Sequence, residues 1–135
     1  MRISSGRNVV DEELSAGRAL GAFARQLHRE RRMRDAALPA ELFGEAAWDI
    51  LLDLFASGAE ERKVRVSSAC IAACVPASTA LRYLSEMERR GLIVRSPSPH
   101  DKRGQYIALS EVCQAEMRQL LGRLQAHRSI PPSPD

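Results

Sequence analysis

The sequence predicts one mainly α-helical domain with a small β-sheet, an α+β architecture, over residues 1–135. Three observations support this prediction. Several segments carry apolar residues at helical spacing. Only 4% of the residues are aromatic, so Leu, Ala, Val and Ile must supply most of the core, which suits helices. Near the C-terminal end, GLIVRSPSPHDKRGQYIALS contains two short alternating segments around a basic centre, which predict two strands joined by a long loop that begins after Arg95.

Composition narrows the class of protein. With 44% hydrophobic and 27% charged residues, the chain is neither disordered nor membranous in type. No apolar run approaches the roughly 20 residues that span a bilayer. The first residues, MRISSGRNVVDEEL, lack the apolar core of a signal peptide, so we expect a cytoplasmic protein. The net charge of +3 is compatible with a polyanionic partner.

Two helices are predicted in the first half. The first covers residues 11–33, with Asp11 as its cap and an apolar stripe of Ala16, Leu20, Phe23 and Leu27. Pro39 breaks the chain. The second helix covers about residues 41–56 and ends at Ser57-Gly58. Its inward positions are Ala47, Ile50, Leu51, Leu54 and Phe55.

A strand and two closely connected helices follow. RKVRV is a strand candidate over residues 63–66, and SSACIAAC is a short helix capped by Ser67 or Ser68. After the Val75-Pro76 turn, a longer helix covers about residues 77–90 and stops at Gly91, which suits a left-handed position. Cys74 stands where such turns often carry glycine, so its backbone is either helical or locally adjusted.

The helix over residues 77–90 has two distinct faces. Ala80, Leu84 and Met87 form the apolar one. The opposite face carries Ser78, Arg82, Ser85 and Arg89, with Thr79 beside it. Small residues let a helix backbone approach the DNA groove, and arginine reaches base edges. This pattern is typical of a groove-reading helix, although a solvated amphipathic helix would show it too.

After the hairpin, Ser110 caps a last helix over residues 111–127. Its apolar positions are Cys113, Met117, Leu120, Leu121 and Leu124. Residues 128–135 contain RSIPPSPD, which cannot continue a helix and is expected to be a flexible tail.

A helix-turn-helix followed directly by a basic hairpin is a winged helix, and the sequence resembles the MarR family of bacterial transcription regulators from about Glu41 to Leu121. The resemblance is most specific in LRYLSEMERRGLIVRSPSPHDKRGQYIALS, where a Met87-Glu88 pair precedes GLI, an arginine follows, and an Asp-x-Arg pattern stands in the wing. The sequence departs from the usual pattern in two places. Helix-turn-helix units often carry a small residue and then, four residues later, a glycine, where this chain has Cys70 and Cys74. The family also often has a glycine at the position of Cys113.

The resemblance implies a fold, a partner and an assembly. The core of residues 41–109 would bind double-stranded DNA, and the helices over residues 11–33 and 111–127 would hold a homodimer across a two-fold axis. Arg103 would enter the minor groove or grip phosphate, Lys102 would add attraction, and Asp101 would orient an arginine. The expected DNA-binding residues are Ser78, Thr79, Arg82, Ser85, Arg89, Arg95, Asp101, Lys102 and Arg103. A small-molecule effector between the terminal helices is left open.

Other functions have less support. The three histidines, His28, His100 and His127, lie on separate elements, and no cysteine–histidine spacing fits a zinc site, so we expect neither an enzyme nor a cofactor. One alternative is a winged-helix module that binds proteins instead of DNA. Another is a redox-sensing repressor that uses Cys70, Cys74 or Cys113; we expect these thiols to be structural, because no obvious charge flanks them to stabilise a thiolate.

Overall fold

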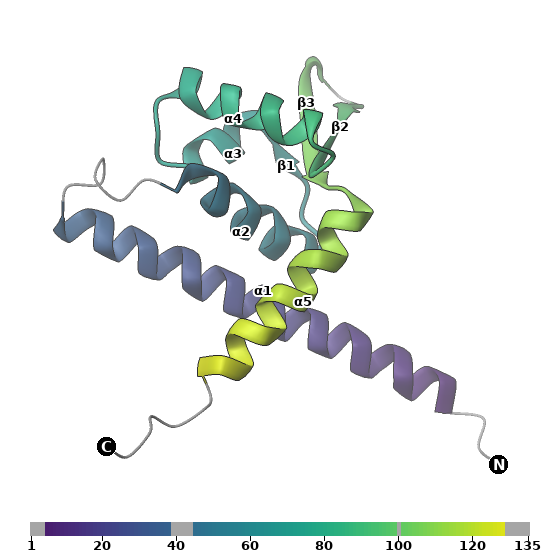
Figure 1. Ribbon diagram of the computed structural model, residues 1–135. Coiled ribbons are helices and arrows are strands. Elements are labelled where there is room, and N and C mark those ends of the chain that lie inside the picture. Colours follow the sequence, from purple (N-terminus) through teal and green to yellow (C-terminus); the bar gives the residue numbers. More distant parts are fainter. Residues whose placement is uncertain (1–4, 39–44, 100, 129–135) are drawn as a thin grey trace.

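The computed structural model describes residues 5–38, 45–99 and 101–128, with positions 5–10, 34, 35, 37 and 101–103 described as backbone alone. The elements follow the predicted order: helices α1 and α2, strand β1, helices α3 and α4, strands β2 and β3, and helix α5. The helix-turn-helix and the sheet lie at one end of the molecule, and α1 and α5 cross at the other (Figure 1). The predicted α+β class is therefore confirmed.

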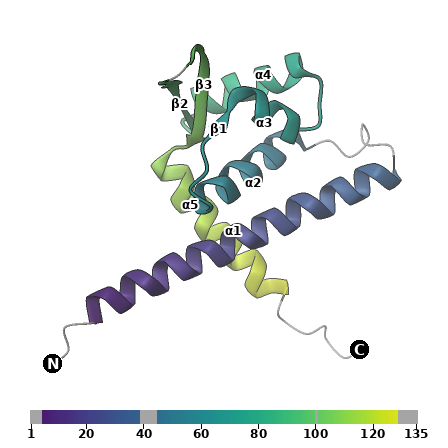
Figure 2. The ribbon, with the colours of Figure 1, turned by 180° about the vertical axis from the view of Figure 1, so that it is seen from behind.

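Helix α1, Ser5–Ala37, is longer at both ends than the predicted 11–33. Asp11 lies inside the helix, so its prediction as the cap is wrong; Gly6 falls in the first turn and no later residue before Asp11 breaks a helix. At the other end Leu38 leaves the helix, because the residue before a proline is disfavoured in α conformation. The N-terminal part of α1 extends beyond the crossing with α5 (Figure 2).

Helix α2, Ala46–Ala59, contains Gly58, so the predicted stop at Ser57-Gly58 is wrong. Residues 41–44, where this helix was expected to begin, lie outside the described residues. The actual stop is a Schellman motif, in which the amide of Glu61 donates to Gly58 across 3.1 Å and that of Arg62 to Ser57 across 2.8 Å. Glu61 adopts φ 56° there, a left-handed position usually given to glycine.

Strand β1 is the pair Val64–Arg65, and helix α3, Val66–Ala72, follows it at once. Arg65 occupies the N-cap position, and its side chain makes no capping hydrogen bond. The prediction that Ser67 or Ser68 caps the helix is therefore wrong, because both serines lie within its first turn. At the turn Cys74 has φ 53°, a left-handed backbone, so the predicted helical alternative is wrong. This conformation is unfavourable for a residue with a Cβ atom.

Helix α4, Ala77–Arg89, ends as predicted at Gly91, whose φ is 76°. The amide of Gly91 donates to Glu88 across 3.0 Å and that of Leu92 to Met87 across 2.9 Å, which completes a second Schellman motif. Strand β2 begins two residues later, so this stop fixes the direction in which the hairpin leaves α4.

Strands β2, Ile93–Ser98, and β3, Asp101–Leu109, form an antiparallel sheet in the order β1-β3-β2. The register runs from Ile93 opposite Leu109 to Pro97 opposite Gln105, and then shifts so that Ser98 lies opposite Asp101. The prediction of a loop that begins after Arg95 is therefore wrong, because pairing continues past Pro97 and the irregularity falls within β3.

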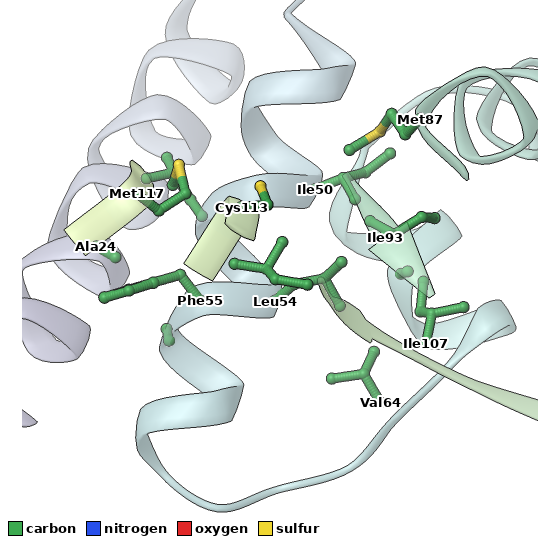
Figure 3. Close-up of a cluster of buried hydrophobic side chains, with 14 of the residues drawn as sticks. Ala24, Ile50, Leu54, Phe55, Val64, Met87, Ile93, Ile107, Cys113 and Met117 are labelled. Carbon is green, nitrogen blue, oxygen red and sulfur yellow. The ribbon is translucent and has the colours of Figure 1, made fainter. Parts of the chain in front are cut away.

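Helix α5, Glu111–Arg128, is capped as predicted, since the amide of Cys113 donates to Ser110 Oγ across 3.1 Å. Its buried residues Cys113, Met117 and Leu121 join a core shared by all five helices and the sheet. Figure 3 shows Phe55 of α2 directed toward Ala24 of α1, and Leu54 on the side of Ile93 and Ile107 of the sheet. Leu, Ala, Val and Ile dominate this core, as the low aromatic content predicted.

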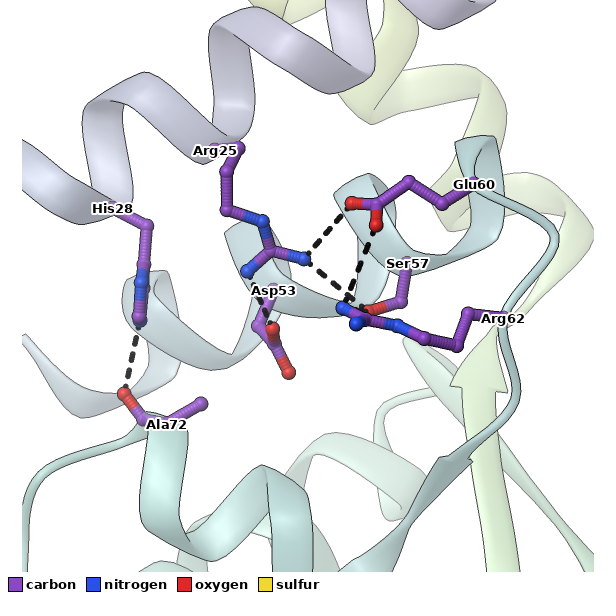
Figure 4. A network of polar contacts seen from close by, with 7 residues as sticks. All are labelled: Arg25, His28, Asp53, Ser57, Glu60, Arg62 and Ala72. Atoms are coloured by element: carbon purple, nitrogen blue, oxygen red, sulfur yellow. Dashed lines mark hydrogen bonds and ion pairs between the residues drawn. The ribbon is translucent and has the colours of Figure 1, made fainter.

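A polar seam holds α1 against α2. Arg25 donates to Asp53 across 2.8 Å and to Glu60 across 3.2 Å (Figure 4). Further along, the buried Asp49 accepts from Arg31 and, across 2.7 Å, from Arg32. Gly21 lets the two helices approach closely, because a Cβ atom there would lie 2.5 Å from the Cβ of Ala59.

Candidate nucleic-acid interface

The outward face of α4 is the first part of the candidate interface. Ala80, Leu84 and Met87 are buried as predicted. Ser78, Arg82, Ser85 and Arg89 are exposed on the other side, and Thr79 is half-buried at the edge. The predicted division of the helix into a core face and a polar face is therefore confirmed, and the five polar residues predicted on α4 share one side of it.

The arginines of this face differ in their partners. Arg89 pairs with Glu86 one turn earlier, and Glu86 also accepts from Arg90 Nε across 2.7 Å. These hydrogen bonds lower the pKa of Glu86 below its usual range and raise the pKa of Arg89. For Arg82, by contrast, the described residues supply no carboxylate partner.

Arg95 of β2 lies between the end of α4 and strand β3. Its Nε donates to Glu88 of α4 across 2.9 Å, and its Nη1 donates to Gln105 of β3 across 3.3 Å. The side chain is largely covered, with 22% exposed. Arg95 therefore joins the end of α4 to both wing strands, a position that the sequence alone did not indicate.

The wing residues Asp101, Lys102 and Arg103 begin β3, next to the turn that ends β2. Their side chains lie outside the described ones, so their expected roles stay predictions. The backbone nevertheless places them at the far end of the hairpin from α5, since β3 runs from these residues to Leu109 and α5 begins at Glu111.

Lys63 and Arg65 form a basic pair beside the wing that was not among the predicted DNA-binding residues. Lys63 Nζ lies 5.4 Å and Arg65 Cζ 5.8 Å from the ring centre of Tyr106. Both are exposed, while Val64 between them is buried. Alternation along a strand places Lys63 and Arg65 on one side, and the predicted strand RKVRV already carried this signal.

A hollow of about 680 Å³ lies between α3, the start of α4 and β3. Its walls include Val66, Ile71, Val75 and Leu81, with Arg65 and Gln105 among the polar residues around it. Ile71 and Leu81 are 78% and 44% exposed. The candidate interface therefore combines a polar helix face with an apolar depression beside it.

The cysteines do not form a cluster with histidines or carboxylates. Within the described ranges no three His, Cys, Asp or Glu side chains are placed to hold a metal ion. Burial raises the pKa of the Cys70 thiol, against an opposing effect of Arg95, and burial with the charge of Glu116 raises the pKa of Cys113. Both thiols are therefore held in their unreactive protonated form at neutral pH.

The terminal helices use much of their apolar surface within the chain. Phe23 and Leu27 of α1 and Met117 and Leu121 of α5 are buried in the core, because α2 and α5 pack on α1. These four residues of the predicted apolar positions are therefore covered within one copy and cannot contribute to a contact between copies. Leu14 and Leu120 are left exposed, at 53% and 40%.

A second hollow, of about 400 Å³, lies along the α1–α2 seam and is lined by Arg18, Arg25 and Arg29 together with Glu60 and Glu61. An effector at the terminal helices stays a prediction. No helix among the described residues is long and apolar enough to cross a membrane.

Comparison with solved structures identifies the fold. The chain is similar to a mutant MarR from E. coli in complex with operator DNA, at 17% identity and a TM-score of 0.51, over 93% of this chain and 76% of that one. It is similar to a MarR family transcriptional regulator from Silicibacter pomeroyi, at 24% identity and a TM-score of 0.52, over 82% and 74%. It is also similar to AbsC from Streptomyces coelicolor, a MarR family transcriptional regulator, at 23% identity and a TM-score of 0.52, over 89% of this chain and 73% of that one. No protein-family model matches the chain, and no curated protein matches it in sequence.

Proposed function

We propose that this chain, which has the winged-helix fold of MarR-family transcription regulators, is itself a regulator that binds double-stranded DNA. The outward face of α4 carries the proposal: Ser78, Arg82 and Ser85 are exposed on one side of a helix whose other side is buried. A similar fold has been solved with operator DNA, that of the mutant MarR from E. coli. A helix of this kind fits the major groove of B-DNA.

Within α4 the residues take different roles. Ser78 and Ser85 are small, so they let the helix backbone come close to base edges. Arg82 is the proposed base reader: the described residues supply no carboxylate partner for it, and a guanidinium can donate two parallel hydrogen bonds to guanine. Arg89 is held by Glu86, and Thr79 lies at the edge of the face, so we assign both to the phosphate backbone.

The wing supplies the second contact of the proposal. Arg103 would enter the adjacent minor groove or grip phosphate, with Lys102 adding attraction and Asp101 orienting an arginine. Arg95 supports this arrangement, because its hydrogen bonds to Glu88 and Gln105 brace α4 against the wing. We expect any direct contact between Arg95 and phosphate to be secondary to this bracing.

We propose a homodimer on a pseudo-palindromic site with half-sites about one helical turn apart. One winged helix reads few base pairs, and a net charge of +3 adds little non-specific attraction, so two copies are needed for specific affinity. The exposed Leu14 on α1 and Leu120 on α5 support the terminal helices as the contact, since burying them between copies would be favourable.

A selection experiment tests the function. The purified protein is incubated with a random duplex library at low salt, and bound DNA is amplified over several rounds. We expect an enriched palindromic sequence. On that duplex Arg103→Ala should weaken binding to all sequences and reduce the log–log salt slope by about one.

The rival function predicts a different outcome. A module that binds proteins would enrich no sequence, and any weak attraction to DNA would respond equally to removal of Arg103 and of an arginine on α5, such as Arg118. Arg118→Ala is the matched control, because it removes one exposed positive charge away from α4 and the wing.

A further inference from the structure

Leu81 is anomalous on the outward side of α4. It follows Ser78 by three residues and precedes Arg82 by one, so it lies on the same half of the helix as the proposed DNA-reading residues. Ala80, Leu84 and Met87 on the other half of the helix are buried in the core, whereas Leu81 is 44% exposed. The exposed part of Leu81 lies beside the proposed DNA-reading residues and in the wall of an apolar hollow, which directs attention to a partner.

The surroundings of Leu81 define that partner. Leu81 lines the hollow between α3, the start of α4 and β3, together with Ile71, which is 78% exposed. The apolar floor is bordered by Arg65 of β1, and Arg82 follows Leu81 on α4. An apolar centre with a cationic border is complementary to a small apolar group set among phosphates. In the major groove that group is the 5-methyl of thymine, the one apolar substituent on a base edge.

We propose that Leu81 reads the 5-methyl group of a thymine in the major groove, with Ile71 shielding the contact from water. The inference rests on the proposed function and adds a specificity determinant to it. It assigns Leu81 to an apolar contact beside the hydrogen bonds of Arg82, so that neighbouring positions of the half-site are read by different chemistry.

Deoxyuridine tests this inference, because it differs from thymidine only by the missing methyl group. In the duplex obtained by selection, each thymine is replaced in turn by deoxyuridine, and affinity is measured by gel shift at one salt concentration. We expect one position in each half-site to lose about three- to fivefold in affinity, the effect of exposing one methyl group.

Protein variants link the effect to the residue. Leu81→Ala should bind the thymine and deoxyuridine duplexes equally, while Leu81→Met, which keeps the apolar volume, should retain most of the difference. Val94→Ala is the matched control, since Val94 is an exposed apolar residue of β2 on the sheet. That variant should discriminate as the wild type does. Thermal unfolding checks that each variant is folded.

The outcomes separate the two proposals. If no duplex is enriched or bound, the proposed function fails and this inference with it. If the selected duplex binds but no deoxyuridine position matters, or the site has no thymine within reach of α4, only the role of Leu81 is overturned. A Leu81→Ala variant that keeps full discrimination would show that another residue reads the methyl, and would also overturn it.

Discussion

The Nε2 nitrogen of His28 on α1 donates a hydrogen bond to the carbonyl oxygen of Ala72, the last residue of α3, across 3.1 Å (Figure 4). A carbonyl oxygen can only accept, so the ring must carry its proton on Nε2. The last carbonyls of a helix lack partners within it. His28 therefore satisfies the end of α3 and ties the long terminal helix to the first helix of the helix-turn-helix.

The first prediction concerns this bond. His28→Ala should lower the free energy of unfolding by about 0.5–1.5 kcal/mol, the usual net contribution of one intramolecular hydrogen bond. Urea denaturation measures it. His127→Ala is the control, because His127 is exposed near the end of α5 and should change stability little. Equal effects of the two substitutions would show that the bond to Ala72 contributes nothing.

The second prediction concerns the close approach of α1 and α2. Gly21→Ala would place a Cβ atom 2.5 Å from that of Ala59, so the helices must separate. We expect a loss of about 1–3 kcal/mol in stability, as for other overpacked cores. Gly122→Ala is the matched control in α5: nothing lies within 4 Å of its added Cβ. That change should stabilise the protein by up to about 1 kcal/mol, and calorimetric melting separates the opposite signs.

The sequence predicted the order of elements and the two faces of α4 because these depend on local periodicity. Ala80, Leu84 and Met87 recur at helical spacing, and Gly91 is the residue that a left-handed helix end favours. Helix ends without such a residue were predicted poorly. Glu61 and Cys74 adopt left-handed backbones despite their side chains, and Arg65 occupies the N-cap position of α3 without a capping hydrogen bond from its side chain. Tertiary packing decides these positions.

The exposed face of α4 was predictable from the sequence, but the contacts that its residues make were not. Arg82 and Arg89 look equivalent in the sequence, yet only Arg89 is held by Glu86. The reach of Arg95 to Gln105 depends on the strand register, which the sequence did not predict because Pro97 suggested a loop. Lys63 and Arg65 could have been found, since they alternate with valines in a predicted strand.

The third prediction uses the difference between the two arginines. Arg82→Ala should cost about 1–3 kcal/mol on the selected duplex and relax preference at one base pair. Arg89→Ala should reduce affinity for selected and random duplexes alike, because Arg89 is assigned to phosphate. Gel shifts on both duplexes test this. Equal losses of affinity for Arg82→Ala on the two duplexes would show that Arg82 contacts only the phosphate backbone.

The fourth prediction concerns the thiols. Burial raises the pKa of Cys70 and Cys113, so the reactive thiolate is scarce at neutral pH and its fraction grows only as pH rises above the ordinary thiol range. Iodoacetamide at neutral pH should therefore modify the exposed Cys74 first and spare the other two, as peptide mass spectrometry would show.

The protection of Cys70 and Cys113 bears on redox sensing. Mild peroxide should leave DNA affinity unchanged while the protein stays folded. A reversible loss of binding that a single Cys→Ser change removes would instead support the redox-sensing repressor.

The last prediction concerns assembly. Phe23 and Met117 are buried within one copy, so an aspartate at either position would unfold the chain and reveal nothing about a dimer. Leu14 on α1 and Leu120 on α5 are the better probes, because both are exposed. Leu14→Asp with Leu120→Asp should leave the fold intact and place charges in the proposed contact between copies. Light scattering at micromolar concentration should then give 14.9 kDa, against twice that mass for the wild type.

Ile71→Asp supplies the control for this experiment. Ile71 is the most exposed of the large hydrophobic residues that the structure describes, at 78%. It lies on α3, beside the candidate DNA surface. Its substitution should leave the mass at that of two copies while weakening DNA binding. The double α1–α5 variant should lose affinity for the palindrome but keep weak binding to a single half-site, because each copy retains α4 and the wing. A wild type that is monomeric, or a dimer that both leucine substitutions leave unchanged, would contradict the proposed role of the terminal helices.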